Sequence, residues 1–134
     1  MQQKKHLYTL KAGERLKQQK KIDALFLSGQ KISLGEIRLV YHGSPSSDKA
    51  SLLIGVGVSK RYFKKAVHRN QIKRWLREAV RLHKIPLQQV VENAGKNLDL
   101  FILFTGKELP DFARCQQLVQ AAFLRLIKKW NPGQ

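Results

Sequence analysis

The segment of residues 64–84 constrains the fold more than any other part of this sequence. Its apolar side chains, among them Ile72, Leu76 and Leu82, recur at the spacing of an α-helix and fall on one face. The opposite face is basic over an arc about 100° wide. This basic arc contains Lys73, Arg74, Arg77, Arg81 and Lys84, with Asn70 among them. A helix sorted in this way needs a second layer on which its apolar face can pack.

Two predicted strands flank this helix along the chain. Residues 52–58 alternate bulky and small side chains, so that Gly55 and Gly57 leave one face nearly bare. Residues 99–105 are apolar on both faces, which is typical of a strand covered on both sides. A strand, a long helix and a second strand indicate a crossover onto a mixed sheet.

Four further segments complete the chain. Residues 18–27 have helical apolar spacing and are followed by Gly29, which can end a helix. In residues 37–42, Ile37, Leu39 and Tyr41 alternate with Arg38, Val40 and His42, which is the period of a strand. Residues 43–48 are rich in Gly, Ser and Pro and predict a loop. Residues 111–130 predict a second long helix.

The expected order is therefore helix, strand, strand, helix, strand, helix, and Gly35 offers a point where the first strand region can divide. We predict an α+β fold, a single-domain sandwich in which helices pack on a central mixed β-sheet. A length of 134 residues suits one domain. We expect residues 13–131 to form that domain and residues 1–12 to be a flexible basic segment.

The charge of the chain restricts its partners. Lys and Arg number 26 against nine Asp and Glu, which gives a net charge of +17. Self-repulsion of this size favours a polyanionic partner: RNA, DNA or an anionic membrane surface. The longest apolar run, residues 100–104, is far shorter than the roughly 20 residues of a spanning helix, so we expect no membrane association. Cys115 is the one cysteine, which excludes an internal disulfide and favours the cytoplasm.

Basic residues are concentrated in two segments. Residues 59–84 contain ten against one acid, Glu78, and residues 1–31 contain eight against Glu14 and Asp23. The helix pattern alone is compatible with a solvated surface or with a phosphate-binding face. Acids that could form ion pairs at four-residue spacing are almost absent, and this favours phosphate binding.

The sequence contains no recognisable catalytic or metal-binding constellation. Its acids are scattered, its four histidines lack ligand spacing, and Cys115 has no partner for a zinc site. Gly55-Val56-Gly57 lacks the rest of a phosphate-binding loop and falls in a predicted strand. Its glycines would instead let a helix backbone or RNA approach closely. We expect no catalytic residue and no metal ligand in the protein itself.

One long motif connects the chain with a known family. Residues 55–81 have the sequence GVGVSKRYFKKAVHRNQIKRWLREAVR, with the spaced core Ala66-Val67-x-Arg69-Asn70-x-x-Lys73-Arg74-x-x-Arg77-Glu78. This stretch resembles the signature of the bacterial ribonuclease P protein component. Glu14-Arg15-Leu16, ahead of a short helix that ends in Phe26-x-x-Gly29, is similar to the family's N-terminus. The order of elements agrees over residues 13–130.

The resemblance implies a fold (ribosomal S5 domain 2-like) with a left-handed βαβ crossover into the last strand. General physical reasoning predicts the opposite hand, because the large majority of such crossovers are right-handed. The resemblance also implies a cleft between the N-terminal helix and the sheet.

The resemblance further implies a function. The chain would be the protein subunit of ribonuclease P, an endoribonuclease that removes the 5′ leader of precursor tRNA. Its partners would be the ribonuclease P RNA and the precursor tRNA 5′ leader, and it would be monomeric when free. The RNA subunit, with its magnesium ions, would perform the hydrolysis, so the protein alone would bind no cofactor.

Two groups of site residues follow from the resemblance. RNA-binding residues would be Lys60, Arg61, Lys64, Arg69, Asn70, Lys73, Arg74 and Arg77. The leader cleft would include Ile22, Phe26 and Tyr41. A core role is an equal alternative for Phe26 and Tyr41, and Trp75 and Trp130 are expected to be core anchors.

The chain departs from the family pattern at two positions. Gln71 stands where the family often has Arg, which removes one possible phosphate contact. Ile22 stands where an aromatic residue commonly lines the cleft, so contact with the leader there would be weaker or purely apolar.

Three alternatives remain open at this stage. A structural ribosomal protein would share the size and charge but would not need the Arg-Asn-x-x-Lys-Arg spacing. A DNA-binding regulator would place the helix of residues 64–84 in the major groove, although that face offers charge and little variety for reading bases. A protein nuclease acting alone is disfavoured by the lack of a catalytic constellation.

Overall fold

The computed structural model describes residues 19–46 and 49–130. Its centre is a four-stranded sheet in the spatial order β1-β2-β4-β3. β2 pairs antiparallel with both β1 and β4, whereas β3 pairs parallel with β4. The strands are β1 (Gln30–Leu34), β2 (Ile37–Pro45), β3 (Leu52–Val58) and β4 (Lys96–Phe104). The predicted mixed sheet is confirmed. The predicted flexible segment of residues 1–12 lies outside the described residues, as do residues 13–18, 47–48 and 131–134.

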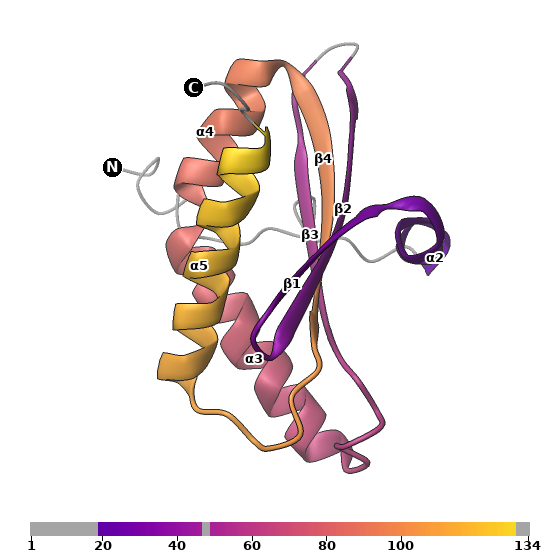
Figure 1. Cartoon of the computed structure of the whole chain (residues 1–134), viewed down its shortest axis with the longest axis vertical. Coiled ribbons are helices and arrows are strands. Elements are labelled where there is room, and N and C mark those ends of the chain that lie inside the picture. The colour runs from indigo at the N-terminus through magenta and orange to yellow at the C-terminus, as the bar shows by residue number, and fades with distance from the viewer. Residues whose placement is uncertain (1–18, 47–48, 131–134) are drawn as a thin grey trace.

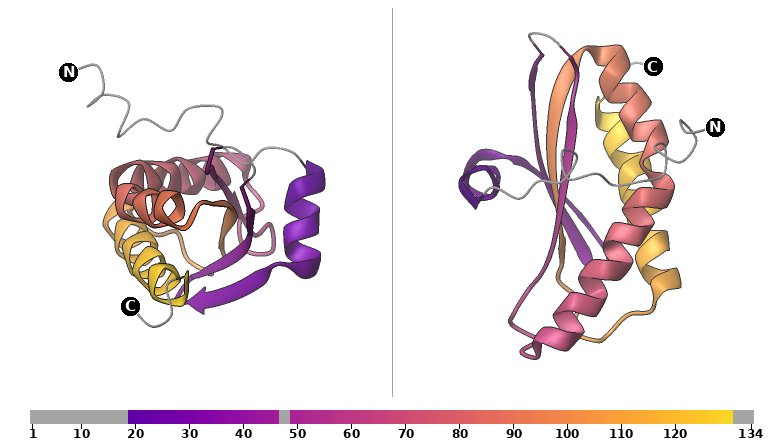
Figure 2. Two further views of the ribbon diagram at one scale, coloured as in Figure 1. Left: turned by 90° about the horizontal axis from the view of Figure 1, so that it is seen from above. Right: turned by 180° about the vertical axis from the view of Figure 1, so that it is seen from behind.

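Helices cover both faces of this sheet unequally, as Figures 1 and 2 show. Three helices lie on one face and α2 lies alone on the other. The helices are α2 (Gln19–Ser28), α3 (Ala66–His83), α4 (Ile85–Ala94) and α5 (Phe112–Trp130). The three predicted helices are therefore confirmed, with ends that differ by one or two residues.

The first strand region divides at Gly35, as the sequence allowed, and the φ of 55° at this glycine makes the tight turn between β1 and β2. One element differs from the expected order. The sequence pattern does not predict helix α4, because a proline such as Pro86 also typically follows the end of a helix. Pro86 instead occupies the first turn of α4, where a missing N–H costs nothing. Gly95 ends α4 in the left-handed conformation.

The crossover from β3 through α3 and α4 to β4 is left-handed. When the two parallel strands are viewed from the helix side and point upward, β4 lies to the left of β3 (Figures 1 and 2). The hand implied by the family resemblance is confirmed, against the general preference for right-handed crossovers. This topology places the C-terminal ends of β3 and β4 side by side, with Val58 opposite Phe104.

The main core lies between the sheet and the three helices. Ile72, Leu76, Ala79 and Val80 of α3 are buried there, as the helical spacing predicts. Leu82 was expected on the same apolar arc, but it is exposed near the end of the helix. Trp75 and Trp130 pack against this core as predicted anchors.

A smaller core lies under α2 on the opposite face. Leu25 packs there against Val40 and Phe101. A Cβ on Gly57 would lie 2.7 Å from the tip of the Phe101 ring. The bare face of β3 therefore makes room for Phe101, and an aromatic side chain rather than a helix backbone or RNA approaches the glycine.

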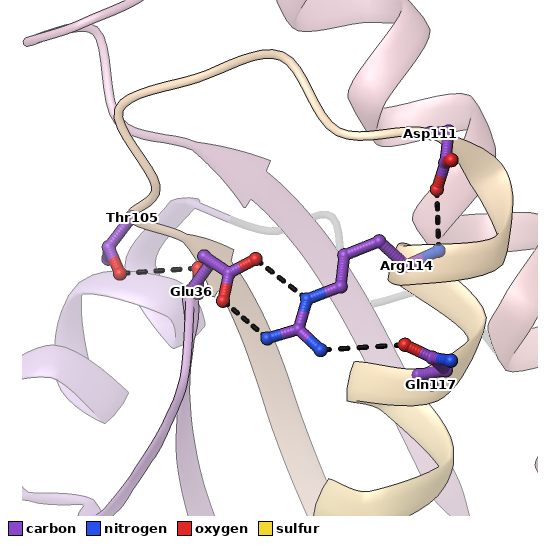
Figure 3. A network of polar contacts seen from close by, with 5 residues as sticks. All are labelled: Glu36, Thr105, Asp111, Arg114 and Gln117. Carbon is purple, nitrogen blue, oxygen red and sulfur yellow. Dashed lines mark hydrogen bonds and ion pairs between the residues drawn. The ribbon is translucent and has the colours of Figure 1, made fainter.

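An ion pair ties α5 to the turn between β1 and β2 (Figure 3). The Arg114 guanidinium donates to both carboxylate oxygens of Glu36, at 2.8 and 2.6 Å. This hydrogen bonding lowers the pKa of Glu36. The backbone carbonyl of Glu36 accepts a bond of 2.7 Å from the Thr105 N–H, and Asp111 caps α5 by accepting 2.8 Å from the Arg114 N–H. The edge hairpin is thus fixed to the helical layer.

Candidate nucleic-acid interface

The loop after β3 and the outer face of α3 form one basic stretch, which we call the basic surface. Most of its side chains are exposed, and those of Arg69 and Lys73 are half-buried. The basic surface consists of all eight residues predicted to bind RNA: Lys60, Arg61, Lys64, Arg69, Asn70, Lys73, Arg74 and Arg77.

The beginning of α3 adds positive potential to the basic surface. Lys65 stands at the N-cap position and makes no side-chain capping bond, and the first turn of α3 contains no acid. The free N–H groups and the dipole at a helix N-terminus favour negatively charged groups. Backbone and side chains at this end of α3 therefore attract anions together.

Glu78 is the one acid in this segment, and its charge is engaged within α3. Arg81 donates to Glu78, with Nε 3.1 Å from Oε2, in a pair one turn apart. This hydrogen bonding lowers the pKa of Glu78 and raises that of Arg81. Glu78 therefore does little to neutralise the first turns of the helix, where Lys64 and Arg69 lie.

Arg69 holds the loop that precedes its own helix. Its Nη1 donates to the carbonyl oxygens of Phe63 and Lys64, at 2.8 and 2.7 Å. The same loop is fixed by the Phe63 side chain, which is buried against Phe104 with ring centroids 6.0 Å apart. Sequence reasoning gave Arg69 a phosphate contact alone, whereas its geometry gives it a role in positioning this loop.

Lys84 was expected on the basic face of the long helix, and this expectation is wrong. The side chain is only 1% exposed. Helix α3 ends at His83, and Lys84 lies at the junction with α4, where the chain changes direction. The angular position of a residue beyond the last helical turn is no longer set by the helix.

The residues predicted for the leader cleft are not brought together. Ile22 and Phe26 belong to α2 and pack against the small core, where the Phe26 ring meets Phe101 edge to face at 5.4 Å. Tyr41 lies on the opposite face of the sheet, in the main core, and is only 5% exposed. Alternation along β2 explains the error, because Tyr41 shares its face with Leu39. Burial raises the pKa of Tyr41.

A pocket between α2 and the sheet has lining residues that sequence reasoning missed. It is lined by Lys21, Ala24, Leu25, Ser28, His42 and Asp99, with a volume of about 210 Å³. His42 follows Val40 by two positions and so lies on the α2 face, which the alternation of β2 could have predicted. The α2 face thus combines apolar side chains with Lys21 and His42.

The described residues contain no group of three or more His, Cys, Asp or Glu side chains able to hold a metal ion. Cys115 is buried, and burial raises the pKa of its thiol to about 11, so the thiolate is scarce at neutral pH. Among the described helices, none is long and apolar enough to cross a membrane.

The fold and this surface together define a class of protein: a small α+β sandwich with a left-handed crossover whose helix α3 presents a concentrated cationic face to a polyanion. Comparison with known proteins gives the particular family. Residues 10–127 match the family model described as Ribonuclease P. The chain therefore belongs to the ribonuclease P protein family.

Two relatives agree with this assignment. The chain is 30% identical to the ribonuclease P protein component of Porphyromonas gingivalis over 119 residues, covering 89% of this chain and 87% of the relative. It is 31% identical to that of Chlorobium phaeobacteroides over 122 residues, covering 84% of each.

The fold is similar to two solved structures. The RNase P protein from Staphylococcus aureus matches with a TM-score of 0.62 at 20% identity, over 88% of this chain and 98% of that one. The RNase P protein from Thermotoga maritima matches with a TM-score of 0.60 at 24% identity, over 87% and 96%. These likenesses support the fold.

Proposed function

We propose that this protein is the protein subunit of ribonuclease P, which removes the 5′ leader of precursor tRNA as a ribonucleoprotein. The observation that carries the proposal is the basic surface, which lies within the part of the chain that matches the family. In this proposal the basic surface neutralises phosphates of the ribonuclease P RNA. The family assignment replaces the ribosomal and DNA-binding alternatives.

The chemistry in this proposal belongs to the RNA subunit and its magnesium ions. The protein would contribute binding and orientation, which can lower the barrier to a reaction without any catalytic side chain. Neutralisation of phosphates by Lys and Arg also reduces the repulsion that folded RNA otherwise needs magnesium to overcome. The protein should therefore matter most at low magnesium concentration. We also propose that the free protein is a cytoplasmic monomer.

The 5′ leader of the precursor would bind on the α2 face. Ile22 and Phe26 supply apolar contact there, and Lys21 and His42 line the neighbouring pocket. Single-stranded nucleic acid binds surfaces that combine stacking groups with nearby positive charge. Tyr41 is left out of this proposal because it faces the main core.

Cleavage of a precursor tRNA by a bacterial ribonuclease P RNA at low magnesium, with and without this protein, tests the function. We expect the protein to restore cleavage at the correct 5′ position. The variant with Lys64→Ala and Arg74→Ala should lose this rescue, because both side chains are exposed on the basic surface. A control with Lys128→Ala and Lys129→Ala removes the same charge from the end of α5 and should retain it. Absence of rescue by the unaltered protein would contradict the proposal.

A further inference from the structure

Tyr62 presents an aromatic ring at the border of the basic surface. Its side chain is exposed, and the residue lies in the loop between β3 and α3. The Arg61 guanidinium carbon lies 5.5 Å from the centre of the ring, and the Lys107 ammonium nitrogen lies 5.8 Å from it. Two cations from different parts of the chain are therefore gathered around one exposed ring.

The parallel pairing of β3 with β4 explains this meeting. β3 and β4 are parallel and in register at their C-terminal ends, so the loops that follow them leave the sheet at the same edge. Tyr62 belongs to the loop after β3 and Lys107 to the loop after β4. The cluster of Arg61, Tyr62 and Lys107, which we call the Tyr62 platform, is thus assembled by the topology of the fold.

The loop that carries Tyr62 is held at both ends. The Ser59 N–H donates to the carbonyl oxygen of Phe104 at 3.0 Å, and the Arg61 N–H donates to the Ser59 hydroxyl at 3.3 Å. On the other side, Phe63 is buried and its carbonyl accepts from Arg69. A ring held in this way loses little conformational freedom when a ligand stacks on it.

The ring and its cations together match the chemistry of a nucleotide. Both cations lie over the ring, so an unpaired base stacks there when one of them moves off that face of the ring to bind a neighbouring phosphate. Bases within a duplex are already stacked on their neighbours and do not reach such a ring. Lys60 and Lys64 continue the positive charge toward the basic surface. These features favour an unpaired nucleotide within a folded RNA.

We propose that the Tyr62 platform stacks one unpaired base of the ribonuclease P RNA beside the phosphates held by the basic surface. This inference rests on the proposed function, because that function supplies the RNA. It adds a contact that depends on an aromatic ring, whereas the contacts of the basic surface depend on charge. The two kinds of contact respond differently to salt.

The test is the affinity of the full-length protein for ribonuclease P RNA at several salt concentrations. Tyr62→Leu removes the ring but keeps an apolar side chain, and it should raise the Kd about 5- to 150-fold, the range known for loss of one stacked base. Its slope of log affinity against log salt should stay unchanged, because stacking releases no counterions. Tyr62→Phe, the matched control, keeps the ring and should bind like the unaltered protein.

Chemical probing of the bound RNA gives a second readout. The unaltered protein and Tyr62→Phe should protect an unpaired base that becomes reactive in the complex with Tyr62→Leu. Equal affinity and equal protection for Tyr62→Leu would overturn the inference and leave the proposed function standing. Failure of the unaltered protein to bind this RNA more tightly than an unrelated RNA of equal length would overturn both.

Discussion

Replacement of Arg69 by alanine should weaken both the fold and RNA binding, because this guanidinium donates hydrogen bonds to the backbone of the loop before α3. The bond to the Phe63 carbonyl is partly buried, and a hydrogen bond from a charged donor contributes about 1.5–3 kcal/mol. The bond to the exposed Lys64 carbonyl can be replaced by water and adds little. We therefore expect the free energy of unfolding to fall by about 2 kcal/mol, which lowers the Tm by about 6–10 °C.

Thermal and urea unfolding followed by circular dichroism measures this loss, with Arg74→Ala as the matched control. Arg74 is exposed on the same helix and, among the residues that the structure describes, makes no hydrogen bond with this loop, so its removal should change the free energy of unfolding by no more than about 0.5 kcal/mol. Both variants should bind RNA more weakly. An Arg69→Ala protein as stable as Arg74→Ala would refute the positioning role and leave Arg69 as a phosphate ligand alone.

Three more predictions concern the small core, the edge hairpin and the α2 face. Gly57→Ala brings a Cβ to 2.7 Å from Phe101 and should cost about 1–3 kcal/mol in urea unfolding. Arg114 lowers the pKa of Glu36, so the ionised carboxylate stabilises the fold fully above pH 4.5, and this stabilisation is lost as pH falls through the lowered pKa. The free energy of unfolding of Glu36→Gln should therefore depend less on pH in this acidic range. Phe26→Leu should raise the Kd for precursor tRNA at least about fivefold and leave the Kd for mature tRNA unchanged. Equal losses of affinity for the two RNAs would indicate that Phe26 serves packing alone.

The periodic parts of the sequence predicted most of the fold. Strand β3 is predictable because bulky side chains alternate with small ones, helices α3 and α5 because each buries one regular face, and β4 because both of its faces are apolar. Pro86 was ambiguous, since a proline can stand either just after one helix or in the first turn of the next. The pattern therefore missed α4.

The sequence predicts those parts of the candidate site that the regular spacing of a helix or strand determines. Helical spacing predicts only the part of the basic surface that lies on α3, whereas Lys60, Arg61 and Lys64 lie in the loop before this helix and follow from the family resemblance. The partners of Arg69 and the burial of Lys84 depend on where the chain turns outside the helix. The misplacement of Tyr41 has a similar cause, because alternation divides β2 into two faces without saying which face meets α2.

The salt dependence of RNA binding tests whether the basic surface holds ribonuclease P RNA by neutralising its phosphates. Each neutralised phosphate contributes about 0.7–0.9 to the slope of log affinity against log salt. The variant with Lys64→Gln and Arg74→Gln should therefore lower the slope by about 1.4–1.8, while Lys128→Gln with Lys129→Gln leaves it unchanged. Equal slopes for the two variants would contradict the account, because binding would then follow net charge rather than this surface.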